Sequence, residues 1–146
     1  MRVYLAGRQL EAKNLKAAAA QYQAVLAIDP NNVPALNNLA WIGGELDDPK
    51  ALGHAERAVK LQPNSYAVLD TYGVLLLKNG QVDKAVPVLE RAHRLAPARN
   101  DVRLNYAKAL IKAGKKDEAR RELEALAKAS ENFAGKNEVA DLLKGL

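Results

Sequence analysis

Three prolines divide this chain of 146 residues at a nearly constant interval. Pro30, Pro63 and Pro97 each follow a stretch rich in alanine and leucine, and they are 33 and then 34 residues apart (63 − 30 and 97 − 63). Proline lacks the N–H that continues a helix and disfavours helical backbone in the residue before it, so each proline indicates a helix end. A spacing of this size is typical of proteins that stack one repeated supersecondary unit.

Each interval contains two helical patterns separated by a short turn. In residues 66–97, apolar side chains recur at helical spacing until Asn79-Gly80, where glycine supplies the left-handed backbone common after a helix. A second helix follows, and the next interval repeats the plan around Ala113-Gly114. Aromatic residues make up only 5% of the chain, while alanine and leucine dominate, a mixture that favours helix. The chain is therefore predicted to be all-α.

The phased residues resemble the tetratricopeptide repeat, a helical hairpin of roughly 34 residues. With Tyr66 as the first position, the residues that fall on the characteristic positions of that family are Tyr72, Gly73, Ala85, Ala92 and Pro97. The resemblance implies an α-α superhelix of the tetratricopeptide type in a single domain spanning residues 1–146. Its helical hairpins, roughly four in number, are expected over residues 1–30, 31–63, 64–97 and 98–130.

Two departures from the repeat are visible. The second unit is one residue short, and we place the deletion in the turn at Glu45–Pro49. Pro87 falls inside a predicted second helix, but near its start, where a mild kink at most is expected. The Asp47-Asp48 pair in the shortened turn is expected to cap the helix that follows. Gly73 is predicted to lie where two helices cross closely, because a larger side chain there would push them apart.

The two ends of the chain differ in pattern. After a predicted loop at residues 132–135, apolar residues at helical spacing predict one amphipathic helix, over about residues 136–145, that caps the last hairpin. The N-terminal hairpin has no comparable cap. Its apolar residues Val3, Leu5 and Leu10 are expected to be covered by an upstream repeat or, in a homodimer, by a second copy of the chain. Met1 runs directly into a helical pattern, as in a fragment of a longer protein.

Shorter segments resemble a more specific group. The run Leu36–Trp41, the turn at Asp47–Leu52 and the segment Ala119–Gly135 look similar to the C-terminal repeats of the tetratricopeptide lipoproteins of the exosortase (PEP-CTERM) system. Those are envelope proteins of Gram-negative bacteria that make extracellular polysaccharide. The resemblance implies a periplasmic, lipid-anchored parent protein with a role in protein sorting or polysaccharide export. Without this resemblance, a cytoplasmic location is expected.

The sequence lacks the patterns of catalytic and metal-binding sites. It contains no cysteine, which excludes disulfides, thiolate nucleophiles and cysteine-based metal sites. His54 and His93 lie in different units, and neither has a carboxylate or a second histidine at the i, i+4 spacing of a helical metal site. No glycine-rich phosphate loop occurs. We therefore predict no enzyme activity, no cofactor and no metal ion.

The net charge of +5 is spread along the chain, with basic and acidic residues interspersed. This arrangement favours a solvated helix surface over a nucleic-acid interface. Residues 108–121 form the most basic segment, and binding of an anionic partner there remains the alternative. No apolar run approaches the ~18 residues of a membrane span, so no direct span is predicted.

In the tetratricopeptide family, the first helix of each unit lines the concave side of the superhelix with its second, fifth, ninth, twelfth and thirteenth residues. Carried over to this chain, the resemblance implies a partner-binding groove made of Asn37, Trp41, Glu45, Asp70, Val74, Leu77, Lys78, Leu104, Lys108, Ile111 and Lys112.

The predicted groove is partly apolar and rimmed by charge, a combination that commonly marks a binding site. Glu45 and Asp70 at one end and three lysines at the other would orient a ligand. Asp70 would repel the terminal carboxylate that some family members clamp, so an extended or helical segment with apolar anchors is favoured. The alternative is a narrow groove whose residues touch one another or the C-terminal helix.

The sequence thus predicts a non-enzymatic scaffold that binds a protein or peptide segment in a concave groove, within a bacterial envelope assembly. The alternative function is a structural spacer whose repeats only separate other domains. A spacer would bind no ligand in the groove and would associate end to end through the N-terminal hairpin.

Overall fold

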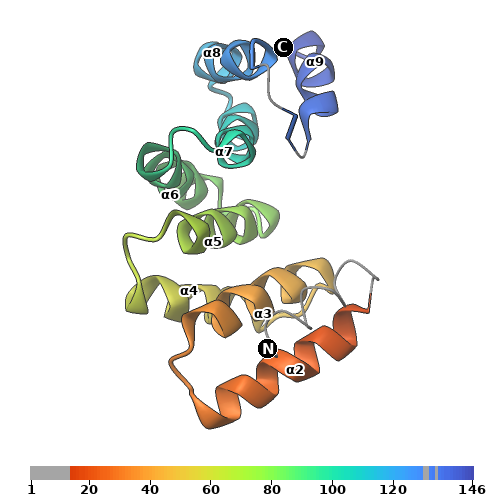
Figure 1. The fold of residues 1–146 in the computed structure, drawn as a ribbon. Coiled ribbons are helices and arrows are strands. Elements are labelled where there is room, and N and C mark those ends of the chain that lie inside the picture. The colour runs from red at the N-terminus through yellow and green to blue at the C-terminus, as the bar shows by residue number, and fades with distance from the viewer. Residues whose placement is uncertain (1–13, 130–131, 134) are drawn as a thin grey trace.

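The computed structural model describes residues 14–129, 132–133 and 135–146, and every regular element in these residues is an α-helix. The helices follow one another as a ladder (Figure 1): α2 (Leu15–Ile28), α3 (Val33–Glu45), α4 (Ala51–Leu61), α5 (Tyr66–Lys78), α6 (Val82–Leu95), α7 (Asn100–Lys112), α8 (Lys116–Ala127) and α9 (Lys136–Lys144). This confirms the all-α prediction. The predicted first helix of the chain, with Val3, Leu5 and Leu10, lies outside the described residues.

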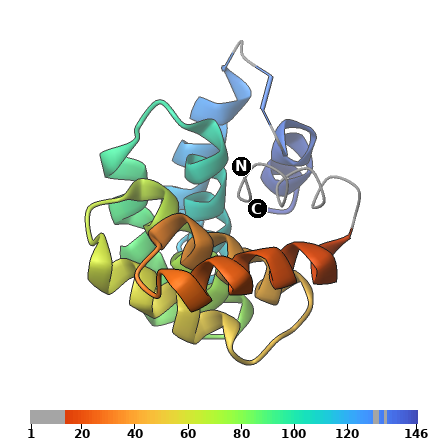
Figure 2. The same ribbon diagram turned by 60° about the horizontal axis from the view of Figure 1, so that its bottom comes forward.

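Each helix packs against the next one in the chain, so α3–α4, α5–α6 and α7–α8 form three hairpins. The first helices of these hairpins also contact one another, α3 with α5 and α5 with α7, and together they make a continuous layer. Seen from one end, the helices follow a curved path with α2 and α9 at its ends (Figure 2). The α3, α5 and α7 layer is the part of the fold on which the predicted groove depends.

The turns within the three hairpins close in the same way. The N–H of Gln81 donates to the carbonyl of Leu76 over 2.9 Å, and the N–H of Lys115 donates to the carbonyl of Leu110 over 2.9 Å. Gly80 and Gly114 precede these donors with φ of 79° and 77°, as expected for a glycine that ends a helix. In the first hairpin the same position is held by Asp47, with φ of 55°.

The structure corrects the predicted position of the deletion in the second unit. The turn after α3 is not shortened, because Asp48 N–H donates to the Gly43 carbonyl over 2.8 Å in the same pattern as the other turns. Residues 48–50 then precede α4, which has 11 residues where α6 has 14. The unit therefore loses its length from the start of the second helix. Asp48 accepts a hydrogen bond from Lys50 N–H (2.9 Å), just before α4, whose N-cap residue Lys50 makes no side-chain cap.

Small residues lie where the helices of a hairpin cross, as predicted. A Cβ on Gly73 of α5 would overlap the side chain of Leu89 on α6. Ala85 and Ala92 of α6 are completely buried. Because a larger side chain at any of these positions would separate α5 from α6, the alanine and glycine pattern sets the distance between the helices. The helix α6 continues through Pro87.

The C-terminal helix α9 covers the last hairpin. Val139 of α9 is buried in a cluster with Leu104 and Ala107 of α7 and with Leu123 and Leu126 of α8. Leu142, Leu143 and Leu146 pack against the same cluster. This burial removes from water the apolar face that a terminal repeat would otherwise expose. The helix α9, Lys136–Lys144, lies where a capping helix was expected over about residues 136–145.

Candidate partner-binding groove

The α3, α5 and α7 layer contains a pocket of about 190 Å³ on its N-terminal half. Its lining combines residues from all three first helices: Trp41, Gly44, Glu45, Asp70, Thr71, Val74, Leu75, Lys78 and Asn105. Five of the predicted groove residues, Trp41, Glu45, Asp70, Val74 and Lys78, are therefore brought together at one place. We call this site the α3–α5 pocket.

Trp41 forms the exposed apolar wall of the α3–α5 pocket, with 45% of its surface accessible to water. Glu45 lies four residues later on α3, so both side chains lie on the same face of the helix, and it is exposed. Asn37, one turn before Trp41, has a buried Oδ1 that accepts no hydrogen bond from the described residues. The α3 side of the pocket thus presents one aromatic ring and one carboxylate, while Asn37 does not line the pocket.

Asp70 forms the acidic floor of the α3–α5 pocket from α5. Its two carboxylate oxygens accept hydrogen bonds from Nδ2 of Asn105 on α7, over 3.0 and 3.2 Å. Burial raises the pKa of Asp70 from 3.8 to about 6, although the hydrogen bond from Asn105 acts in the opposite direction. No basic side chain of the described residues lies within 4 Å of this carboxylate. Asp70 is therefore a partly desolvated carboxylate without a cation partner among them.

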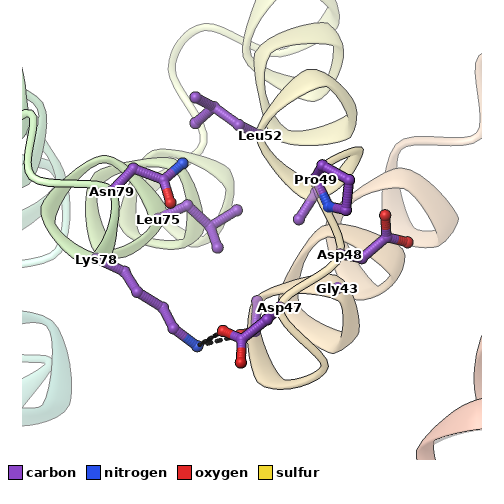
Figure 3. Close-up of a pocket in the computed structure, with 10 residues that line it drawn as sticks. Gly43, Asp47, Asp48, Pro49, Leu52, Leu75, Lys78 and Asn79 are labelled. Atoms are coloured by element: carbon purple, nitrogen blue, oxygen red, sulfur yellow. Dashed lines mark hydrogen bonds and ion pairs between the residues drawn. The ribbon is translucent and has the colours of Figure 1, made fainter.

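Lys78 lines both the α3–α5 pocket and a second pocket of about 200 Å³ at the turn between α3 and α4. Its ammonium group points toward that turn (Figure 3), where it lies 3.2 Å from the Asp47 carboxylate and donates to the Gly44 carbonyl. The charge of Lys78 is thus engaged by Asp47 and the end of α3. The remaining charged residues of the lining, Glu45 and Asp70, are acidic, so the α3–α5 pocket is negatively charged.

The C-terminal half of the predicted groove is not an open surface. Leu104 was expected to face a partner, but it is only 3% exposed and packs against Val139 of α9. A Cβ on Gly135 would lie 2.6 Å from Cδ2 of Leu104, which shows how closely the chain before α9 approaches α7. Ile111 also packs against the cluster that α9 covers. The alternative expectation, in which groove residues touch the C-terminal helix, therefore describes Leu104, which shares a buried cluster with Val139.

The remaining predicted groove residues have separate environments. Lys108 pairs with Glu138 of α9 over 2.8 Å, and Lys112 is exposed at the end of α7. Leu77 and Val74 are partly buried and pack against the core cluster that contains Leu89 and Leu110. Val74 reaches both this cluster and the α3–α5 pocket.

Sequence reasoning missed Asn105, which holds the Asp70 carboxylate. It follows Leu104, the fifth residue of its helix, and so falls outside the positions that the family resemblance assigns to the groove. The repeat spacing alone does not place Asn105 in the groove, and its role is seen only in the structure. Asn105 lies one unit after Thr71, which also lines the α3–α5 pocket, so the sixth residue of the helix reaches the groove here.

Two family models, both described as tetratricopeptide repeat, match residues 76–143 and 49–100. Together they extend from residue 49 to residue 143, well over half of the chain. The chain belongs to the tetratricopeptide repeat family. The tetratricopeptide fold implies protein partners, and members of the family are in general non-enzymatic scaffolds. No curated protein matches the chain.

Solved structures share this tetratricopeptide fold. PilF of Pseudomonas aeruginosa is 25% identical with a TM-score of 0.83, over 99% of this chain and 67% of its own. A tetratricopeptide protein of Thermus thermophilus is 20% identical with a TM-score of 0.83, over 98% of this chain and 80% of its own. An O-GlcNAc transferase mutant of Thermobaculum terrenum is 26% identical with a TM-score of 0.72, over 75% of this chain. The match spans only 21% of that transferase.

The two histidines lie away from the α3–α5 pocket. His93 of α6 stacks on Tyr106, with ring centroids 5.9 Å apart, and its Nε2 lies 3.8 Å from Glu122. Burial lowers the pKa of both His93 and His54. Within the described part of the chain, no group of three or more His, Cys, Asp or Glu side chains could hold a metal ion. No described helix is both long enough and apolar enough to cross a membrane.

Proposed function

We propose that this tetratricopeptide protein binds an extended or helical segment of another protein on its α3, α5 and α7 layer, centred on the α3–α5 pocket. The observation that carries the proposal is the exposure of Trp41. A tryptophan that is 45% exposed beside a pocket contributes little to the core, whereas tryptophan is enriched among the residues that dominate protein interfaces.

The surroundings of Trp41 support this proposal. Apolar surface from Val74 and Leu75 lies in the same pocket as the carboxylates of Glu45 and Asp70, so a partner segment would meet both apolar contacts and directional acceptors. The pocket volume of about 190 Å³ is below the roughly 300–1,000 Å³ of clefts that enclose whole small molecules. A pocket of this size accommodates one side chain of a larger partner.

The test is partner capture by a photocrosslinkable residue placed at Asn37, which shares a helix face with Trp41, in chains with and without Trp41→Ala. Leu95→Ala is the matched control, since Leu95 is 44% exposed on α6, away from the α3–α5 pocket. We expect one partner that is recovered with the unaltered chain and with Leu95→Ala but is lost with Trp41→Ala. Equal recovery from all three chains would falsify the groove as the binding site.

The setting of this interaction is a further part of the proposal. The resemblance of segments such as Leu36–Trp41 to exosortase-system lipoproteins supports a partner within a bacterial envelope assembly linked to protein sorting or polysaccharide export. Fractionation of the native cell with an antibody to this chain tests it. Recovery with the periplasm and membranes is expected, and recovery only with the cytoplasm would contradict the envelope setting.

A further inference from the structure

We propose that the α3–α5 pocket receives an arginine side chain of the partner segment, with the guanidinium between Asp70 and Trp41. This inference deepens the proposed function and depends on it. It specifies the chemistry of one anchor residue, which the exposure of Trp41 alone does not specify.

The charges of the α3–α5 pocket select a cation. Two carboxylates, Asp70 and Glu45, line it, and the one lysine that lines it, Lys78, is already paired with Asp47 at 3.2 Å. A partner carboxylate would meet repulsion from both acids, and a neutral side chain would leave the Asp70 charge partly buried and unpaired. A cation would restore to Asp70 the stabilisation that burial removes.

The Asp70 carboxylate retains acceptor capacity for a cationic donor. Asn105 occupies part of its acceptor capacity with hydrogen bonds of 3.0 and 3.2 Å. A carboxylate offers about four lone-pair sites. Because the Asn105 amide bridges the two oxygens, the outer lone pair of each oxygen remains, and a guanidinium N–H can donate to one of them as a charge-assisted hydrogen bond. Glu45 is exposed on the neighbouring helix and would contribute attraction from a second side.

Trp41 distinguishes arginine from lysine. The guanidinium stacks on aromatic rings and is less strongly hydrated than an ammonium ion, so it enters a partly desolvated site more readily. Trp41 lines the same pocket as Asp70, and part of its ring is covered while 45% of its surface remains accessible. An arginine that reaches Asp70 would therefore also contact Trp41.

Binding of this arginine should depend on pH. The charged groups that act on Asp70 are Asp101 and Arg99 at the start of α7, with Glu45 on α3 and Lys78 on α5 lining the same pocket. Since burial raises the pKa of Asp70 to about 6, this carboxylate is mostly ionised at pH 7.5 and mostly protonated at pH 5. The affinity for arginine should fall about tenfold between these two values, in proportion to the ionised fraction.

The test uses the single tryptophan of the chain as its reporter. The indole N–H signal of Trp41 is followed by NMR while the chain is titrated with the peptide acetyl-Ala-Ala-Arg-Ala-Ala-amide. Matched peptides carry citrulline, lysine or glutamate in place of arginine. We expect a saturable shift with arginine, a several-fold weaker one with lysine, and none with citrulline or glutamate.

Two variants that each replace one acidic residue test which carboxylate binds the arginine. Asp70→Asn should weaken arginine binding about tenfold or more, because it removes a charge-assisted hydrogen bond. Glu45→Gln should weaken it less, and since Glu45 is exposed this variant keeps the test valid even if Asp70→Asn folds poorly. Asp141→Asn, an exposed acid on α9, is the matched control and should leave binding unchanged.

Several results would overturn the inference. One is the absence of any shift with the arginine peptide up to about 10 mM, well above a millimolar dissociation constant. The others are a shift with citrulline equal to that with arginine, tighter binding of the lysine peptide, or unchanged arginine binding in both acid variants. Each of these would leave the proposed function standing if partner capture still requires Trp41. Capture that does not depend on Trp41 would instead remove the proposed function itself.

Discussion

The fifth residue of the first helix faces a solvent-open pocket in one repeat and is buried in the next. In α5 this residue is Asp70, which lines a pocket open to solvent, and in α7 it is Leu104, which is 3% exposed beneath α9. The two helices lie side by side in one layer and occupy equivalent places in the repeat. The difference between them is that α9 and the residues before it cover α7, while no described helix covers the α3–α5 pocket.

This contrast shows that the same position in two repeats is buried or exposed depending on what packs over it. We call α7 beneath α9 the covered half of the layer and the α3–α5 pocket its open half. The covered half is part of the core, because Leu104 and Ile111 pack in the cluster that α9 completes, and their burial stabilises this end of the stack. The open half contains an exposed tryptophan and a carboxylate whose ionised form burial disfavours. An exposed aromatic ring beside a carboxylate with a raised pKa supports the binding site proposed above.

The largest effect is expected on the covered half. Leu104→Ala should lower the free energy of unfolding by about 2–5 kcal/mol, because it removes a fully packed side chain and leaves a cavity between α7 and α9. Urea unfolding followed by circular dichroism measures the change. A loss below about 1 kcal/mol would show that α9 does not seal this residue and that both halves of the layer are open.

The second prediction concerns how the contribution of Asp70 to stability changes with pH. The folded-state pKa of Asp70, about 6, lies above its ordinary value of 3.8, so the folded state holds this proton more tightly than the unfolded chain. The contribution of Asp70 to stability is thus fully present below pH 3.8 and is lost as pH rises through about 6. Asp70→Asn should therefore stabilise the chain at pH 7.5 by about 1–3 kcal/mol and have little effect at pH 4.

Unfolding of the Asp70→Asn variant at both pH values checks this, with Asp141→Asn as the exposed control on α9. A destabilised Asp70→Asn variant at pH 7.5 would mean that the hydrogen bonds from Asn105 outweigh the cost of burial. In that case the open half would be part of the stabilising framework, like the covered half.

A third substitution tests how closely the chain before α9 packs over Leu104. Gly135 has a φ of 89°, and a Cβ there would lie 2.6 Å from Cδ2 of Leu104. Gly135→Ala should cost about 1–2 kcal/mol from the left-handed backbone alone, with an added penalty for displaced packing. Gly80→Ala is the control, since its φ is 79° but nothing lies within 4 Å of its Cβ. Equal losses in the two variants would contradict a tight closure over Leu104.

The smallest effect is expected at the open half. Trp41→Ala should change the free energy of unfolding by no more than about 1 kcal/mol, although it removes the largest side chain of the layer. The measurement is the same urea unfolding used for Leu104→Ala, and the ratio of the two losses expresses the difference between the halves. A loss of about 3 kcal/mol or more, as for a fully buried tryptophan, would place Trp41 in the core.

Sequence reasoning succeeded where structure depends on local backbone chemistry. The helix ends at Pro30, Pro63 and Pro97 and the turns at Gly80 and Gly114 were predicted from the N–H that proline lacks and the left-handed backbone that glycine adopts. It was wrong about the deletion in the second unit, because Asp47 adopts the left-handed conformation and closes the turn as glycine does elsewhere. A one-residue change in repeat length does not show which element has lost the residue.

The sequence by itself determined the repeat, its period, the all-helical fold and the closing helix α9, because these follow from local preferences and from apolar residues at helical spacing. Only the tertiary structure decided which groove residues face water. Leu104 and Trp41 belong to the same predicted surface, and their exposure differs because a helix more than thirty residues after Leu104 packs over one and not the other. The pairing of Asp70 with Asn105 is likewise a contact between two repeats, and the spacing within one repeat does not contain it.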